Sequence, residues 1–107
     1  MDSKTQAKYD ARAKILKALA HPTRLFIVDQ LCQADEKCVC ELTEMVGADM
    51  STVSKHLALL KDAGIVQDEK RGSQVFYQLQ VKCVMKFFDC IESVMQCNAQ
   101  RQNELMA

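Results

Sequence analysis

One stretch of sequence decides the fold: Met50-Ser-Thr-Val-Ser-Lys-His-Leu-Ala-Leu-Leu-Lys-Asp-Ala-Gly-Ile-Val66. Its apolar residues Val53, Leu57 and Leu60 recur at helical spacing and predict a buried stripe that ends at Gly64. The first turn is polar and made of small hydroxyl and amine side chains. Such a turn suits a DNA groove, because it donates hydrogen bonds while the backbone comes close. An ordinary amphipathic helix would look similar, so the flanking sequence has to decide.

The sequence before this stretch predicts three further helices. The first covers residues 4–20 and is broken by His21-Pro22, since proline disfavours helix at the preceding residue and favours it at the next start. We expect His21 to be a cap or hinge residue. A second helix runs from about Pro22 to Cys32, and a third from Cys38 or Val39 to Val46-Gly47. Two short helices joined by a glycine-containing turn predict a helix-turn-helix over about residues 38–64.

The sequence after the opening stretch predicts a hairpin over residues 65–79. Val75, Tyr77 and Leu79 alternate with polar residues, as in a half-buried strand, and Arg71-Gly72 is the expected turn. After a helix-turn-helix such a hairpin is a wing. Lys70 and Arg71 at its tip are placed to contact phosphate or an adjacent minor groove. The alternative is a hairpin that only covers the core, with tip charges that serve solubility.

Residues 81–105 predict a long last helix with one apolar stripe. A stripe of this kind is too apolar to stay wet on a small domain, so the first helix or the same helix of a second subunit must cover it. We expect a twofold homodimer through the terminal helices, which would also present two recognition helices to successive major grooves. The stripe consists of Val84, Phe87, Phe88, Ile91, Val94 and Met95.

Length and charge bound the class of protein. The 107 residues predict a single domain, 1–107, mainly α with a small β-hairpin: a winged helix-turn-helix. Net charge is zero, but residues 1–24 carry six positive and two negative charges, and residues 25–48 one positive and five negative. Any DNA affinity should therefore depend on shape and a few specific contacts, with a moderate salt dependence. No membrane segment or secretory signal is recognisable, so we expect a cytoplasmic protein without a membrane partner.

Six cysteines are many for this length. A disulfide framework is one interpretation, but in a reducing cytoplasm thiols more often bind metal, sense oxidants or pack. Cys83, Cys90 and Cys97 are seven residues apart on the last predicted helix, about 10 Å per step, so no two of them can bind one ion within a straight helix. They contribute singly, pair across a dimer, or pack. Packing is also the expected role of Cys32.

The order of motifs resembles the ArsR/SmtB family of metal-sensing repressors. The matching motifs are His-Pro-Thr-Arg24, Cys38-Val-Cys40-Glu-Leu42, Ser-Thr-Val-Ser-Lys-His-Leu57, Leu-Lys-Asp-Ala-Gly-Ile-Val66, Arg71-Gly and Tyr-Gln-Leu79, within about residues 10–95. The cysteine motif is similar to that of the arsenic, antimony, cadmium and lead sensors. The resemblance implies a homodimer that sits on an operator in double-stranded DNA and leaves it when a toxic ion binds.

The chain departs from these relatives at the ligands. Thr43 stands where the arsenic-sensor motif has a third cysteine, residues 1–31 lack the extra cysteines of cadmium sensors, and the last helix has no histidine for a nickel, cobalt or zinc site. The metal site is therefore expected to contain Cys38 and Cys40, with Cys83, Cys90 or Cys97 as possible further ligands. Soft thiolates select arsenite, antimonite, cadmium, lead or mercury, and arsenite is the first expectation from the resemblance. No metal is needed for folding.

Two residues apart in a regular helix, Cys38 and Cys40 would point about 200° away from each other. Both can bind one ion only if the start of the third helix is loosened, which would misplace the recognition helix packed on it. A second interpretation is a redox or persulfide switch, as in some relatives, with Cys32 and Cys90 or Cys97 as the reacting pair.

An enzyme is not expected. Only His21 and His56 are available as bases, and no phosphate-binding glycine loop is present. A dimeric interaction protein without DNA binding would explain the last helix but not the polar first turn or the wing. We therefore predict a DNA-binding repressor released by a thiophilic ion, with DNA contacts from Ser51, Thr52, Ser54, Lys55, His56, Lys70 and Arg71.

Overall fold

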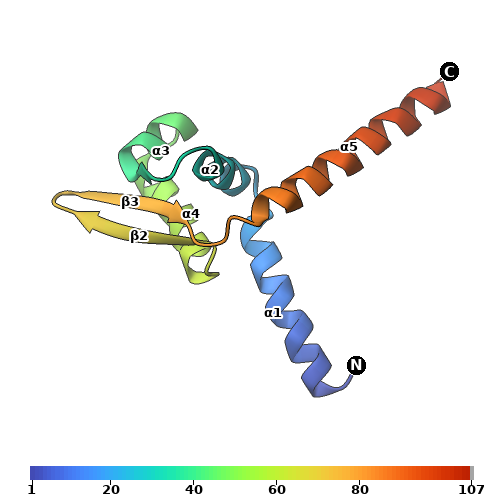
Figure 1. Ribbon diagram of the computed structural model, residues 1–107, viewed down its shortest axis with the longest axis horizontal. Helices are drawn as coiled ribbons and strands as arrows, with labels where there is room; N and C mark the ends of the chain where they lie inside the picture. Colours follow the sequence, from blue (N-terminus) through green and yellow to red (C-terminus); the bar gives the residue numbers. More distant parts are fainter. Residues whose placement is uncertain (107) are drawn as a thin grey trace.

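The computed structural model describes residues 1–106 and has the predicted winged helix-turn-helix architecture (Figure 1). A three-stranded antiparallel sheet lies beside the helices, in the order β1-β3-β2. Among residues 1–106, none of the helices combines the length and the hydropathy that a membrane crossing requires. The elements are α1 (Ser3–Leu19), α2 (Pro22–Gln33), β1 (Lys37–Cys38), α3 (Val39–Val46), α4 (Met50–Asp62), β2 (Val66–Arg71), β3 (Gln74–Leu79) and α5 (Val84–Met106).

Local capping explains why the helices begin where they do. His21 caps α2 as expected: its Nδ1 accepts a hydrogen bond of 3.1 Å from the Thr23 amide, and Pro22 takes the first helical position. Asp49 caps α4, and its carboxylate accepts a hydrogen bond of 2.7 Å from the Thr52 amide. The turn between α3 and α4 depends on Gly47, whose φ of 77° lies in the left-handed region that favours glycine.

The wing consists of two strands of six residues each, β2 and β3, joined by Gly72 and Ser73. Arg71 still pairs with Gln74 in the ladder, so the turn lies one residue later than the predicted Arg71-Gly72. Strand β1 was not predicted. Lys37 and Cys38 pair with Tyr77 and Phe76 of β3, so the residues just before α3 form an edge strand of the sheet.

One hydrophobic core joins α2, α3, α4 and the sheet. The predicted stripe of α4 is fully buried: Val53, Leu57 and Leu60 are 0% exposed. Ile27 of α2 and Leu42 of α3 are equally buried and complete the centre. Residues 21–79 therefore form a closed unit, which we call the body.

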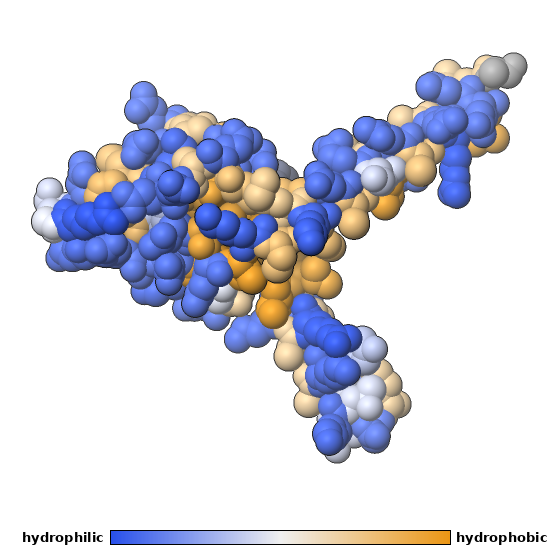
Figure 2. Space-filling model, viewed as in Figure 1, coloured by the Kyte–Doolittle hydropathy of each residue, from blue (hydrophilic) through white to orange (hydrophobic). Residues whose placement is uncertain are grey.

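Helices α1 and α5 are arms that leave the body in different directions (Figure 1). They raise the radius of gyration to 16.8 Å, against about 13 Å for a compact chain of this length. No residue of α5 is buried, and α1 buries only Leu19. Apolar side chains gather where the two arms leave the body (Figure 2), and the predicted apolar stripe of α5 remains largely uncovered by α1 of the same chain.

Candidate nucleic-acid interface and thiol site

The polar face of α4 is open. Ser51, Thr52, Ser54 and Lys55, all predicted to contact DNA, are exposed on the first turns of the helix. The Ser51 hydroxyl donates a hydrogen bond of 3.0 Å to the capping carboxylate of Asp49, so its oxygen stays available as an acceptor. Hydrogen bonds from the Thr52 amide and hydroxyl and from Ser51 lower the pKa of Asp49, which keeps this carboxylate charged. The lysine and the hydroxyl groups can contact phosphates and base edges.

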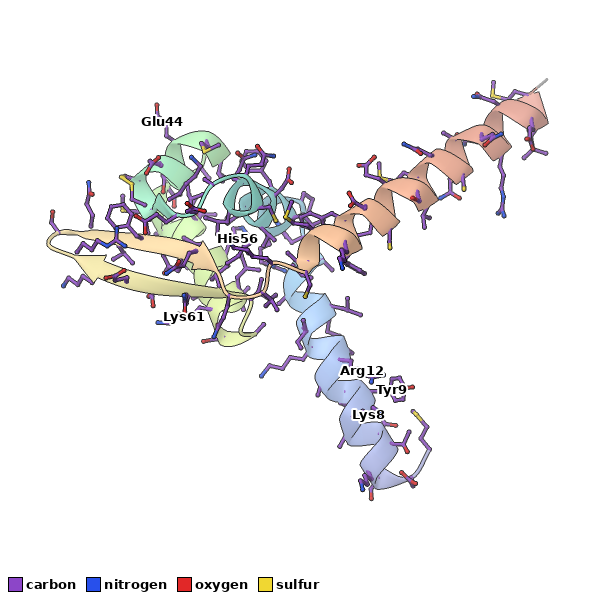
Figure 3. All side chains as sticks on the ribbon, viewed as in Figure 1. Lys8, Tyr9, Arg12, Glu44, His56 and Lys61 are labelled. Carbon is purple, nitrogen blue, oxygen red and sulfur yellow. A yellow bond between two sulfur atoms is a disulfide. The ribbon has the colours of Figure 1, made fainter. Side chains whose placement is uncertain are left out.

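His56 turns away from that face, toward the junction of α1 and α2 (Figure 3). Its Nδ1 accepts a hydrogen bond of 3.1 Å from Arg24 Nη1, and its ring centroid lies 4.5 Å from that of His21. Arg24 Nε in turn donates to the Ala18 carbonyl at 2.7 Å. Burial, followed by the charges of His21 and Arg24, lowers the pKa of His56. The geometry gives His56 a packing role, with only its other ring nitrogen left for a DNA contact.

The two wing cations differ in their surroundings. Lys70 is exposed, whereas Arg71 is held by two carboxylates: Glu36 at 2.6 and 2.7 Å in a bidentate pair, and Glu69 at 2.8 Å. The guanidinium also lies 4.6 Å from the ring centroid of Phe76. These hydrogen bonds raise the pKa of Arg71 and lower that of Glu36. Arg71 can contact phosphate only by giving up or sharing these partners.

Cys38 and Cys40 are brought together at the start of α3. The structure joins them in a disulfide, with Cα atoms 5.4 Å apart. Cys38 is not helical: it is the N-cap, in an extended conformation with φ −78° and ψ 159°. The prediction that the first turn of α3 must loosen was wrong, because Cys38 lies outside the regular helix. Two sulfurs can face one site while α3 stays intact.

The same cysteine takes part in a capping box. Cys38 Sγ accepts a hydrogen bond of 3.3 Å from the Glu41 amide, and Glu41 Oε1 accepts one of 3.2 Å from the Cys38 amide. The start of a helix favours negative charge, so it stabilises a thiolate at this position. Sulfur chemistry at Cys38 therefore acts directly on the beginning of α3.

A pocket of about 250 Å³ lies over the two cysteines. Its walls come from α3, from the start of α4 and from the tip of the wing, and they include the predicted DNA-reading residue Ser54. The two cysteines therefore share one pocket with residues of the recognition helix and of the wing. The lining residues are Cys38, Val39, Cys40, Met50, Ser54, Ser73, Gln74 and Val75.

The other four cysteines are free thiols. Cys90 and Cys97 are exposed on α5. Cys83 is also exposed but lies in the turn just before α5, so the prediction that placed it on the last helix was wrong. Cys32 is half-buried on α2, where burial raises its pKa. Within residues 1–106, His, Cys, Asp and Glu side chains form no group of three that could hold a metal. A single chain therefore does not bring an α5 cysteine to Cys38 and Cys40, and a contribution across a dimer stays a prediction.

Sequence reasoning missed the partners of several site residues. Glu36, which holds Arg71, and Arg24, which holds His56, lie 35 and 32 residues away from them along the chain, so no local pattern points to these pairs. The capping role of Cys38 did have a signal: Cys38-Val-Cys-Glu41 has the spacing of a capping box, with cysteine in place of serine.

Comparison with known proteins agrees with this geometry. Residues 21–68 match the family described as bacterial regulatory protein, arsR family. An uncharacterized HTH-type transcriptional regulator of Methanocaldococcus jannaschii, MJ1325, is 39% identical over 85 residues, which cover 77% of this chain and 96% of the relative. The arsenical resistance operon repressor of Bacillus subtilis is 40% identical over 72 residues, covering 67% and 66%. Several other curated relatives are matched over about half of their length.

Solved structures show the same fold. The homodimeric winged helix-turn-helix DNA-binding domain Mb0332 from Mycobacterium bovis aligns with a TM-score of 0.78 and 28% identity, over 94% of this chain and 93% of that domain. Such relatives are DNA-binding transcriptional regulators and not enzymes. With the body, the wing and the polar face of α4 in place, the chain belongs to the ArsR family of winged helix-turn-helix transcriptional regulators.

Proposed function

We propose that the protein is a homodimeric repressor that leaves its operator when a thiophilic metal(loid), arsenite before antimonite, cadmium or lead, binds Cys38 and Cys40. The observation that carries this proposal is the position of the two sulfurs, in one pocket with residues of the recognition helix and the wing. A cytoplasmic location fits the need for reduced thiols.

The DNA-reading part of the proposal uses the open face of α4. Ser51, Thr52, Ser54 and Lys55 contact bases and phosphates, while Lys70 and Arg71 hold the backbone from the wing, Arg71 after release from its carboxylates. His56 contributes mainly by supporting α4. Lys55→Ala should weaken operator binding about uniformly across sequences and lower the salt slope by about one. Fluorescence anisotropy at several salt concentrations measures both quantities, and an unchanged slope would exclude a phosphate contact.

The dimer part rests on the uncovered arms. Phe87, Val94 and Met95 of α5 are 40%, 59% and 56% exposed, and Ile15 and Leu16 of α1 are 46% and 49% exposed. Apolar surface on this scale favours a second copy as its cover. A twofold arrangement of the arms would also present two copies of α4 to one operator.

The effector part follows from thiol chemistry. Arsenite, As(OH)₃, condenses with two thiols to give a dithiolate with one remaining hydroxyl, and two waters leave. Cα atoms 5.4 Å apart suit two sulfurs on one arsenic atom. The similarity to an arsenical resistance operon repressor supports this choice of ion. The effector must bind the DNA-free form better than the DNA-bound form, and a coupling of about 1–3 kcal/mol makes a useful switch.

The route of that coupling is short. Cys38 pairs with Phe76 of the wing through β1 and β3, and Arg71 stacks on the same Phe76 while bonding Glu36 just before β1. Movement at Cys38 therefore reaches the wing through a ladder pair and an ion pair. Helix α3 carries the same movement to α4, on which it packs.

The test is anaerobic fluorescence anisotropy of the reduced protein on DNA from upstream of its own gene. Arsenite, cadmium, zinc and a persulfide donor are titrated into complexes of the wild type and of Cys38→Ser. Release by arsenite that disappears in Cys38→Ser supports the proposal. Release by the persulfide donor alone, or release unaffected by Cys38→Ser, would move the sensor to Cys32 and the α5 thiols.

A second candidate function is a thiol-oxidation switch at the same pair, and the disulfide between Cys38 and Cys40 favours it. Two thiols and one hydrogen peroxide would give the disulfide and two waters, which leaves no thiolate for an ion. In this case peroxide alone would release the operator and dithiothreitol would restore binding. Cys32→Ser is the matched control, because Cys32 lies outside the pair.

A further inference from the structure

Three sulfur-bearing side chains line the pocket over the start of α3. Two are Cys38 and Cys40, and the third is Met50, the first residue of α4. The other lining residues are apolar or carry a hydroxyl or amide, so the pocket has no carboxylate and no imidazole in its wall. The strongest soft-metal donors in this pocket are therefore its three sulfur atoms, beside the neutral oxygens of Ser54, Ser73 and Gln74.

The donor set argues against the commoner cations. Magnesium and calcium require oxygen ligands, and zinc sites are usually completed to four by cysteine, histidine or carboxylate. No third residue of those types joins Cys38 and Cys40 in the part of the chain that the structure describes. Thr43, at the position where relatives resembling this motif have cysteine, has its hydroxyl buried and does not line the pocket. Thiolate and thioether donors together select Cu(I) among biological metals.

We propose that Met50 Sδ is the third donor of a sulfur-only site with Cys38 and Cys40, and that this site takes a soft monovalent cation, Cu(I) or its analogue Ag(I). The inference rests on the proposed function, because it uses the same two thiolates. Met50 is 54% exposed and its side chain has three rotatable bonds, so its sulfur can reorient within the pocket without breaking a packed core. Two thiolates and one monovalent cation leave a net charge of −1, which the start of α3 stabilises.

The proposed Cu(I) site and the arsenite site differ in the helices that they connect. Arsenite needs only the two cysteines, whereas Cu(I) bound also to Met50 would join the beginning of α3 to the beginning of α4. Met50 precedes Ser51, so the cation would hold the first turn of the recognition helix. If DNA binding requires another position of this first turn, Cu(I) weakens DNA binding. By thermodynamic linkage, DNA then weakens Cu(I) binding by the same factor.

The experiment measures Cu(I) affinity of the reduced full chain, without DNA, by competition with a chromophoric Cu(I) chelator under anaerobic conditions. Wild type is compared with Met50→Leu, with Cys38→Ser and with the matched control Met45→Leu, whose methionine is on α3, 40% exposed and outside the pocket. Removing a group that only orients a metal ligand lowers metal affinity about 10- to 100-fold. Removing a direct donor with Met50→Leu should therefore lower the Cu(I) affinity at least about tenfold. Met45→Leu should bind as the wild type does.

Arsenite titration of the same variants separates the two proposals. Weaker Cu(I) binding in Met50→Leu with unchanged arsenite binding supports the Met50 site, as does a drop from three to two sulfur neighbours in Cu(I) X-ray absorption spectra. Equal Cu(I) affinity of Met50→Leu and wild type would overturn it and leave the arsenite switch standing. If Cys38→Ser changes neither arsenite nor Cu(I) binding, the proposed function itself fails. Far-UV circular dichroism of each variant checks that the fold is kept.

Discussion

The body and the arms of this molecule are built from similarly apolar sequences but reach different states. In the body, Ile27, Leu42 and Leu57 are 0% exposed, whereas no residue of α5 is fully buried and Val94 is 59% exposed. The four ion pairs found in residues 1–106 all lie in the body as well (Lys37–Glu41, Lys61–Asp68, Arg71–Glu36 and Arg71–Glu69). The body thus has a closed apolar core and the ion pairs, while the arms carry an apolar stripe that one chain leaves largely uncovered.

This difference assigns stability and assembly to separate parts of the chain. Residues that hold the body should set the free energy of folding, and residues of the arms should set the dimer. Arg12 over the ring of Tyr9, 5.1 Å from its centroid, is the kind of contact that the α1 arm makes with itself (Figure 3). Such exposed contacts contribute little, so the arms need a partner.

The largest expected effect comes from truncating the core of the body. Leu57→Ala should lower the free energy of unfolding by about 2–5 kcal/mol, because it removes a fully buried side chain and leaves a cavity. Urea unfolding followed by circular dichroism measures this. Ser93→Ala on α5, at an exposed position off the apolar stripe, is the control and should cost well under about 1 kcal/mol. Equal losses in both variants would show that body and arms fold as one unit.

The next effect concerns the arms alone. Phe87→Asp should raise the dimer dissociation constant by an amount that corresponds to about 2 kcal/mol or more, because it places a charge in the centre of the proposed interface. At protein concentrations low enough for both the wild type and Phe87→Asp to be monomeric, the two proteins should have the same unfolding midpoint. Sedimentation velocity over a range of concentrations gives the constant.

Ser93→Asp is the control for this charge, because Ser93 is exposed on the opposite side of α5, where its hydroxyl donates to the Asp89 carbonyl at 3.1 Å. If Ser93→Asp and Phe87→Asp weaken the dimer equally, the effect comes from added negative charge on α5 and not from the apolar stripe. An undisturbed Phe87→Asp dimer would remove α5 from the interface.

A smaller effect on operator affinity is expected when an ion pair within the body is removed. Glu36→Gln removes the bidentate partner of Arg71 and should free this arginine for phosphate, so operator affinity should rise by a few fold. The salt slope should become steeper by up to about one, as expected for one more phosphate contact. Asp68→Asn, which releases Lys61 from its ion pair at 3.0 Å, is the matched control at another place. Affinity unchanged by Glu36→Gln would show that Arg71 stays on Glu69 or away from DNA.

What could be predicted from the sequence depended on how local its cause is. The starts of α2 and α4 follow from His21-Pro22 and from Asp49, which act within three residues. Because of its period, the stripe of α4 was correctly predicted as buried. Strand β1 has only two residues, Lys37 and Cys38, and exists because β3 offers an edge almost 40 residues later. No local pattern contains that information.

The site shows the same limit more sharply. That Cys38 and Cys40 belong together was predictable from the motif, but their facing geometry depends on Cys38 lying outside the helix. The inward position of His56 depends on Arg24 and His21 from another helix. No local pattern places Met50 in the cysteine pocket, because the packing of α3, α4 and the wing forms this pocket.

The smallest expected effect is a pH dependence within the body. The pKa of His56 is lowered in the folded chain, mainly by burial and then by the charges of His21 and Arg24, so the unfolded chain binds the proton more readily. Its contribution to stability is therefore present above the unfolded pKa of about 6.5 and is lost as the pH falls through the lower folded value. The urea midpoint should be higher at pH 7.5 than at pH 5.5. His56→Gln, which keeps an acceptor for Arg24, should reduce this difference while α5 variants such as Ser93→Asp leave it unchanged. A pH dependence that persists in full in His56→Gln would place its source outside the junction of α1, α2 and α4.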